Sequence, residues 1–180
     1  MAKKKKGGIW PFLVGIAAAL ILGWWIFPHI LFSEQEQPFT FGHRAHLEQD
    51  LQCTDCHHYR ADGSFDGVPG LESCATPDCH AEVIAGTPAE KTFVNEYVKP
   101  GKEVPWKIYQ AQPDNVYFSH IAHREYDCVR CHPDVEGTDD LPPHFENKLT
   151  GYTSRTMTMD ECERCHAQNG ASNGCFVCHM

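Results

Sequence analysis

The 180-residue sequence contains ten cysteines and twelve histidines, side chains that can bind metals or form covalent bonds, and their spacing is regular. The cysteines form five close pairs, and a histidine directly follows the second cysteine of every pair. Numbered along the chain, these sites 1 to 5 are Cys53–Cys56–His57, Cys74–Cys79–His80, Cys128–Cys131–His132, Cys162–Cys165–His166 and Cys175–Cys178–His179. Site 2 has four residues between its cysteines, and each of the other sites has two.

The pattern C-x-x-C-H is the attachment signature of c-type haem. The two thiols add to the vinyl groups of the haem, and the adjacent histidine is then held under the iron as its proximal ligand. Repetition makes this interpretation much stronger than a single motif would, and no cysteine is left over. We therefore predict five covalently attached haem c groups, with all ten cysteines binding the cofactor and the histidine of each site binding iron.

Other uses of paired cysteines fit the pattern less well. An even number of cysteines in an oxidising compartment usually indicates disulfides, but disulfides do not require a following histidine. A zinc site would need two C-x-x-C knuckles and also leaves that histidine unexplained. A thioredoxin-type dithiol would need one pair in a βαβ unit, which this sequence lacks.

The iron of a low-spin electron carrier needs a second axial ligand, and seven histidines lie outside the five sites. They are His29, His43, His46, His58, His120, His123 and His144. Two matching frames, Phe41-Gly-His43-x-x-His46 and Phe118-Ser-His120-x-x-His123, each precede an attachment site. We predict that both frames supply distal histidines, which would give low reduction potentials. Met157 and Met159 are alternative ligands, although packing beside a haem explains them more simply.

An apolar segment precedes all of these motifs and follows four lysines, Lys3 to Lys6. Residues 9–27 would form a helix of roughly 30 Å, enough to span the hydrocarbon core of a membrane. The positive-inside rule then places the lysines in the cytoplasm and the residues after position 32 on the far side of the membrane, which is the periplasm if the membrane is a bacterial inner membrane. A cleaved signal peptide is the alternative, because the alanines at positions 17–19 resemble a cleavage site. The apolar run continues past them, however.

The remaining residues, 33–180, are acidic: they hold 11 lysines and arginines against 24 aspartates and glutamates, so that 11 − 24 gives a formal charge of −13. This charge disfavours nucleic acid and favours a basic protein partner. With about 30 residues per haem, we expect a small, loop-rich, mainly short-helical domain whose apolar side chains pack on porphyrin faces. We divide the chain into residues 1–32 (lysines and anchor), 33–85 (two-haem half), 86–114 (connector) and 115–180 (three-haem half).

The residues around the motifs resemble two known families. The series Phe41-x-His43-x-x-His46, Cys53-x-x-Cys56-His57-His58 and Cys74-x4-Cys79-His80 is similar to the front half of a class III tetrahaem cytochrome. The series Pro105-Trp106, Pro113-Asp114-x-Val116-Tyr117-Phe118-Ser119-His120 and Thr156-Met157-x4-Cys162 resembles the multihaem subunit of alternative complex III and of the bacterial menaquinone reductase (Qrc) complex. The short length and single apolar segment fit the Qrc branch better.

The resemblance implies which histidine serves as the distal ligand of which haem. It assigns His43 to site 1, His58 to site 2, His120 to site 3, His123 to site 4 and His144 to site 5, with the last two exchangeable. His46 serves a third haem in class III cytochromes, but this half has no third attachment site, so His46 and His29 are left over. One hypothesis is that they bind a sixth haem that is held without thioether bonds. The alternative is that His46 packs against a haem or binds a propionate, and that His29 lies at the membrane interface.

The resemblance also implies a function. The chain would relay electrons from a basic periplasmic tetrahaem cytochrome toward menaquinone without being catalytic itself. Its neighbours in the complex would be integral membrane, iron–sulfur and molybdopterin-oxidoreductase-like subunits. One alternative is a free-standing quinol dehydrogenase cytochrome of the NapC/NrfH type, although site 1 begins well beyond the apolar segment. A multihaem enzyme such as a nitrite reductase would need an open iron position, whereas every motif here carries its histidine.

Overall fold

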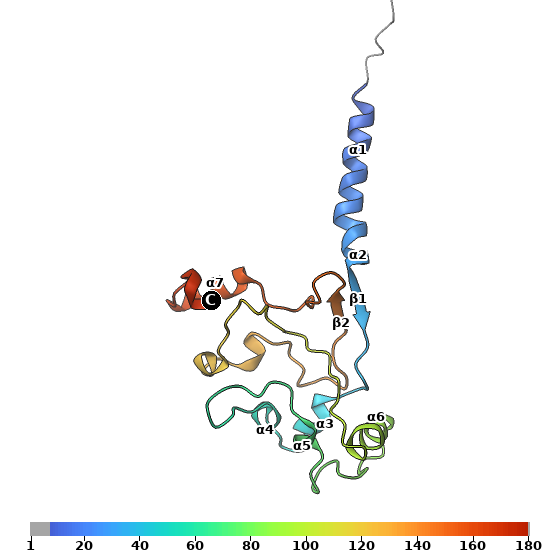
Figure 1. Cartoon of the computed structure of the whole chain (residues 1–180), viewed down its shortest axis with the longest axis vertical. Coiled ribbons are helices and arrows are strands. Elements are labelled where there is room, and N and C mark those ends of the chain that lie inside the picture. The colour runs from blue at the N-terminus through green and yellow to red at the C-terminus, as the bar shows by residue number, and fades with distance from the viewer. Residues whose placement is uncertain (1–7, 180) are drawn as a thin grey trace, which may run out of the picture.

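The computed structural model describes residues 8–179 and joins one long N-terminal helix to a small domain of loops and short helices (Figure 1). The lysines predicted to lie in the cytoplasm, Lys3 to Lys6, are outside the described residues. The long helix projects away from the domain, so the two parts are distinct in shape. The prediction of a small, loop-rich domain with short helices is confirmed.

The long helix is continuous from Trp10 to Leu31, but its hydrogen bonding changes along its length. It is α-helical over Trp10–Leu20 (α1), π-helical over Ile21–Ile26 (η1) and α-helical again over Phe27–Leu31 (α2). The wider turn precedes Pro28, which has no N–H to donate to the preceding turn. With 22 residues, a mean hydropathy of 1.9 and no part of its most apolar window buried, the helix is long and apolar enough to cross a membrane.

A two-stranded antiparallel sheet lies directly below this helix. Strand β1 (Phe32–Gln35) follows the helix without a break and pairs with strand β2 (His144–Asn147). The register places Phe32 opposite Asn147 and Gln35 opposite His144. The sequence did not predict this sheet, because neither segment has the alternating pattern of a strand. The pairing ties the start of the domain to a segment late in the chain.

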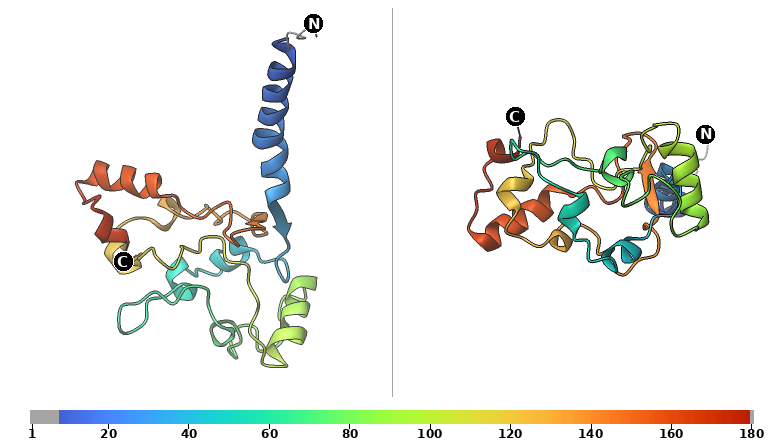
Figure 2. Two further views of the ribbon diagram at one scale, coloured as in Figure 1. Left: turned by 45° about the horizontal axis from the view of Figure 1, so that its top comes forward. Right: turned by 90° about the horizontal axis from the view of Figure 1, so that it is seen from below.

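The other elements are single turns or short helices. They are α3 (His43–Leu47), α4 (Cys53–Cys56), α5 (Leu71–Cys74), α6 (Pro88–Phe93), η2 (Val94–Val98), η3 (His120–His123), η4 (Cys128–Arg130), α7 (Met159–Asn169) and α8 (Cys175–Cys178). Most of them contain part of an attachment site or a His-x-x-His frame. Figure 2 shows them spread around the domain rather than stacked in layers. Most of the short helices of the domain therefore coincide with the sequence motifs.

Very little of the polypeptide is packed against itself. Among the described residues, the buried apolar side chains are Phe93 and Val94, both on the helix formed by α6 and η2. Phe93 packs on Phe39, which packs in turn on Trp106, with ring centroids 5.5 and 4.9 Å apart. The accessible surface is 13600 Å², against about 8,800 Å² expected for a compact monomer of this mass. The chain alone therefore lacks an ordinary hydrophobic core.

We expect the domain to be unfolded when haem is not attached. The full chain, produced in detergent without the haem-attachment machinery, should show no amide protection against hydrogen exchange beyond residue 33, because so little apolar surface is buried by protein alone. The same chain with haem attached is the control and should show protected amides around the five sites. A protected domain in the haem-free chain would contradict this expectation.

Candidate haem sites

Every attachment motif folds into one tight turn that brings its histidine next to its first cysteine. In sites 1, 3 and 5 the histidine backbone N–H donates to the carbonyl of the first cysteine at 2.8 Å (His57 to Cys53), 2.9 Å (His132 to Cys128) and 2.9 Å (His179 to Cys175). Site 4 lies inside the continuous helix α7. In site 2 the same bond joins His80 to Cys74 at 3.0 Å, because Cys79 closes an extra turn by donating to Thr76. The longer spacing thus preserves the arrangement of thiols and imidazole.

The state of the cysteines agrees with haem attachment. None of the ten forms a disulfide. Burial raises the pKa of the Cys74 thiol to about 11, with a further contribution from Cys56. Within residues 8–179, no group of three or more His, Cys, Asp and Glu side chains is arranged to hold a metal ion.

The two His-x-x-His frames, on α3 and η3, fold alike. In each frame the preceding phenylalanine stacks on the second histidine and meets the first histidine edge-on. Centroid distances and interplanar angles are 4.8 Å and 18° for Phe41–His46, 5.0 Å and 84° for Phe41–His43, 4.7 Å and 22° for Phe118–His123, and 4.8 Å and 89° for Phe118–His120. The duplication seen in the sequence is therefore also a duplication of structure.

Three histidines of these frames each face the histidine of an attachment site at one common distance. The ring centroids are 6.2 Å apart for His120–His132, 6.1 Å for His123–His166 and 6.1 Å for His46–His80. A metal–imidazole bond is about 2 Å long, so two imidazoles on opposite sides of one metal ion have centroids about 6 Å apart. The residues present thus fit a haem iron with two axial histidines at sites 2, 3 and 4.

The remaining histidine of the first frame, His43, lies beside site 1. Burial lowers the pKa of His43, and the nearby imidazoles of His57 and His46 lower it further. Its Nδ1 is buried and has no hydrogen-bond partner in the described part of the chain. Each frame therefore reaches two successive sites, the first frame sites 1 and 2 and the second frame sites 3 and 4.

At site 2 the structure places a different histidine from the expected one opposite the proximal histidine. His46 faces His80 there, in place of the expected His58. The Nε2 atom of His58 instead lies 3.0 Å from the carboxylate of Asp66, and the backbone N–H of Asp66 donates to the His58 carbonyl at 2.9 Å. The loop after site 1 thus holds the His58 ring by the nitrogen that an iron would need. His46 is consequently not left over for a sixth haem.

His144, the histidine expected at site 5, lies elsewhere in the domain. His144 is only 4% exposed, packs on Tyr109 and has no hydrogen-bond partner for Nδ1 among the described residues. It lies on β2 at the foot of the long helix, whereas site 5 lies on the opposite side of the domain in Figures 1 and 2. His144 therefore does not face His179, because pairing with β1 holds it elsewhere. His29, on α2, binds the Trp25 carbonyl through Nδ1 at 2.7 Å.

Backbone carbonyls fix the orientation of several site histidines through Nδ1. The Nδ1 atoms of His57, His166 and His179 donate to the carbonyls of Gly67, Ser172 and Asn115 at 2.9, 2.9 and 3.2 Å. The second histidines of the frames, His46 and His123, donate in the same way to Gly42 and Ser119 at 2.9 and 2.8 Å. When Nδ1 carries the donated proton, the lone pair of Nε2 is free to bind iron.

Site 2 departs from this rule, because the Nδ1 of His80 donates to the carboxylate of Glu90 at 3.0 Å. Glu90 lies in the first turn of α6, where Thr87 is the N-cap and accepts a hydrogen bond from the Glu90 backbone N–H at 3.1 Å. Sequence reasoning missed Glu90, since an acid three residues after a threonine is an ordinary helix start. Thr87 and Pro88 are the signal that could have placed the helix, and with it Glu90, close to site 2.

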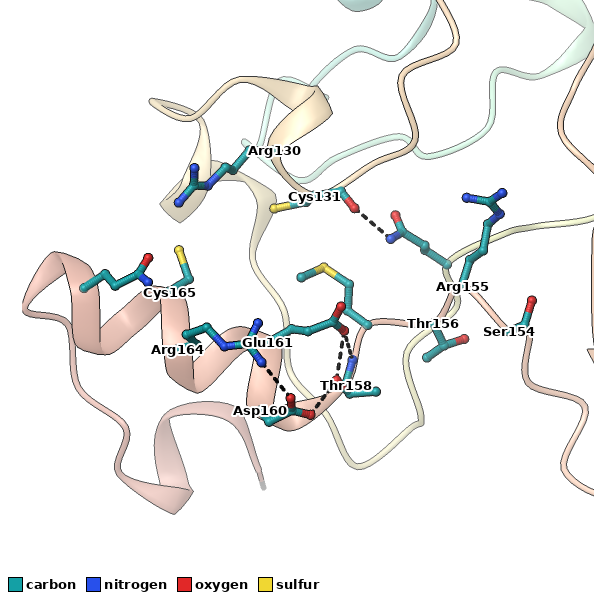
Figure 3. A pocket seen from close by; sticks show the side chains of 13 residues that line it. Arg130, Cys131, Ser154, Arg155, Thr156, Thr158, Asp160, Glu161, Arg164 and Cys165 are labelled. Carbon is teal, nitrogen blue, oxygen red and sulfur yellow. Dashed lines mark hydrogen bonds and ion pairs between the residues drawn. The ribbon is translucent and has the colours of Figure 1, made fainter. Parts of the chain in front are cut away.

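A cavity of about 510 Å³ lies between sites 3 and 4 (Figure 3). Cys131 of site 3 and Cys165 of site 4 both line it, and so do three arginines, Arg130, Arg155 and Arg164. The arginines have the charge and geometry to bind carboxylates such as haem propionates. Met157 also lines this cavity, whereas Met159 is 64% exposed, so a packing role beside a cofactor fits Met157 alone.

Thiols of different sites lie close enough to affect each other. Burial raises the pKa of four thiols, and in each case a nearby thiol of another site raises the pKa further. Cys79 of site 2 acts on Cys56 of site 1, and Cys128 of site 3 acts on Cys53 of site 1. Cys165 of site 4 acts on Cys131 of site 3, and Cys178 of site 5 acts on Cys162 of site 4. Other contacts agree, since Phe65, in the loop after site 1, stacks on His120 with ring centroids 4.2 Å apart. Val116, just before the second frame, forms a β-bridge with His179. The sites therefore form the series 2–1–3–4–5.

Two comparisons with known proteins agree with this geometry. Residues 28–100 match the model of the class III cytochrome c family. The chain is also 48% identical to a protein of Nitratidesulfovibrio vulgaris strain Hildenborough named menaquinone reductase, multiheme cytochrome c subunit. That alignment of 192 positions covers 96% of this chain and 90% of the relative. Both resemblances drawn from the sequence motifs are confirmed.

Removing the Thr87 side-chain oxygen should weaken the start of α6. We expect Thr87→Ala to lower the free energy of unfolding by about 1 kcal/mol, because the Glu90 backbone N–H loses its acceptor. Denaturant unfolding of the haem-loaded protein, followed by fluorescence, measures the change. Thr87→Ser keeps the hydroxyl and is the matched control, expected to remain near the wild type. Equal stability of all three proteins would show that the cap does not support this helix.

Proposed function

We propose the function that follows from family membership: this chain belongs to the family of menaquinone reductase multihaem cytochrome c subunits, and it transfers electrons within a membrane-bound menaquinone reductase complex. The observation that carries the proposal is the set of five Cys–Cys–His turns, three of them with a second imidazole 6.1–6.2 Å from the first. Irons with two protein ligands suit electron transfer rather than substrate binding.

The cofactors of this proposal are five covalent haem c groups. The cysteines of the five sites form the thioether bonds, and the histidine of each site is the proximal ligand. The distal ligands are His43 at site 1, His46 at site 2, His120 at site 3 and His123 at site 4. The haems supply the electron chemistry, while the chain binds them, orients their axial imidazoles and limits access of water.

The division into residues 33–85, 86–114 and 115–180 is kept in this proposal. Each His-x-x-His frame falls in the same half as the two sites that it faces, which supports a pair of two-haem modules with site 5 added to the second. The series 2–1–3–4–5 supports a single electron path with sites 2 and 5 at its ends. Residues 86–114 connect the modules and carry α6.

The long helix Trp10–Leu31 is the membrane anchor of this proposal, with the haem domain in the periplasm. Its length and hydropathy support the anchor, and Lys3 to Lys6 support the orientation. The partners are integral membrane, iron–sulfur and molybdopterin-oxidoreductase-like subunits. The acidic domain, with a formal charge of −13 after residue 32 (11 − 24), favours a basic periplasmic tetrahaem cytochrome as the electron donor.

Purification from native membranes tests this function. An affinity-tagged chain should carry the other subunits with it, and the complex should oxidise a reduced tetrahaem cytochrome while reducing a menaquinone analogue. The mass and the haemochrome spectrum should fit five covalent haems; an additional, extractable haem would support the sixth-haem alternative. Oxidation of menaquinol by the chain alone would favour a free-standing quinol dehydrogenase. Carbon monoxide binding at sites 1 to 4 of the reduced wild-type chain, where two imidazoles are proposed for each iron, would favour a multihaem enzyme.

Two histidine substitutions separate the proposed pairing of His46 with site 2 from the pairing of His58 with site 2 that class III cytochromes imply. His46→Ala should leave one haem without its distal ligand, because His46 is the imidazole that faces His80. Electron paramagnetic resonance should then show one new high-spin ferric signal. His58→Ala is the matched control and should keep every haem in its wild-type spin state, because the His58 Nε2 binds Asp66. The opposite result would restore the expected assignment of His58 to site 2.

A further inference from the structure

Glu90 is a buried carboxylate in direct contact with a site histidine. Its side chain is 5% exposed. It accepts hydrogen bonds from the backbone N–H groups of Ile84, Ala85 and Gly86 at 2.8, 3.2 and 2.6 Å and from His80 Nδ1 at 3.0 Å. Three backbone N–H groups and the imidazole N–H all donate to its two oxygens, and this set of donors favours the ionised carboxylate. The geometry therefore holds Glu90 as an anion.

An anionic partner changes the electronic character of the histidine that it binds. At sites 1, 4 and 5, Nδ1 donates to a neutral backbone carbonyl, whereas at site 2 it donates to a carboxylate. A carboxylate acceptor draws the Nδ1 proton toward itself and makes the imidazole a more basic ligand. A more basic ligand stabilises ferric iron over ferrous iron. The buried charge acts in the same direction, since it attracts the more positive ion and is poorly screened by water.

The surroundings of Glu90 also fix the orientation of the imidazole. Phe93, on the same helix, meets the His80 ring edge-on, with centroids 5.9 Å apart and an interplanar angle of 87°. His46 lies on another side of that ring, so Glu90, Phe93 and His46 together leave it little freedom. This is also the region that contains the buried apolar side chains Phe93 and Val94. The carboxylate is thus held in place by packing as well as by hydrogen bonds.

We propose that Glu90 is a positioning residue that orients His80 and lowers the reduction potential of the haem at site 2. The inference rests on the proposed function, because it requires a haem attached to Cys74 and Cys79. In the step concerned, one electron from the neighbouring haem or from the donor protein converts ferric to ferrous iron, and no bond is made or broken. Glu90 keeps its charge in both states and so biases the equilibrium between them.

The experiment is a spectroscopic redox titration of the haem-loaded full chain carrying Glu90→Gln. Glutamine keeps the size of the side chain and an oxygen for the amide donors, but it removes the charge. We expect the reduction equilibrium constant of one haem to rise about tenfold, which corresponds to about 59 mV for one electron, while the other haems are unchanged. Glu82→Gln is the matched control: Glu82 lies two residues from His80, but its side chain is 78% exposed and contacts Lys99 instead.

The outcomes are distinguishable. Absence of a haem on Cys74 and Cys79 in the wild type would overturn the proposed function at this site. A Glu90→Gln protein with all five haems and no shift beyond that of Glu82→Gln would overturn the inference, because a purely structural role leaves the potential unchanged. If Glu90→Gln fails to retain haem, near-infrared magnetic circular dichroism of the oxidised wild type decides. One charge-transfer band at higher energy than the others supports the carboxylate-bound imidazole, and a uniform set of bands refutes it.

Discussion

A haem iron accepts an imidazole only through a nitrogen whose lone pair is free, and much of this domain is arranged around that requirement. Carbonyl groups of ordinary loops hold Nδ1 of His57, His166 and His179, which leaves Nε2 available. The loops after the attachment motifs therefore orient the site histidines, although these loops contain little regular structure. His58 is the exception, because its Nε2 contacts the carboxylate of Asp66.

The second organising feature is the repeated frame of two histidines on one short helix. Residues three positions apart lie on the same side of a tight helical turn, so one turn presents two imidazoles to two neighbouring sites. The phenylalanine before each pair holds both rings, with nearly the same geometry in α3 and η3. Two sites that share one turn are necessarily close in space. Close spacing of the sites is what an electron path requires, and here it is a consequence of local helix geometry.

The third feature is the division of packing between protein and cofactor. Apolar side chains around the sites are largely exposed in the chain itself, such as Phe176 within site 5 at 94%. Within residues 8–179, the apolar side chains that the chain buries by itself, Phe93 and Val94, lie beside site 2. A carboxylate is screened least where water is excluded, so this is also the place where Glu90 acts most strongly on a histidine. Site 2 thus differs from the other sites both in its packing and in the acceptor that its proximal histidine contacts.

The sequence by itself determined what is local along the chain: five pairs of thiols, the histidine beside each pair, the apolar helix and the duplicated frame. These features depend on bonds or turns of a few residues, so spacing alone reveals them. The resemblance suggests His58 for site 2 and His144 for site 5, whereas the structure places His46 opposite His80 and holds His144 on β2. Tertiary structure decided these pairings, because a distal histidine reaches its partner through space and the path of the intervening loop sets the distance. The β1–β2 sheet and the contact between Glu90 and His80 were beyond sequence reasoning for the same reason, since no periodic pattern marks a single pairing between separate segments.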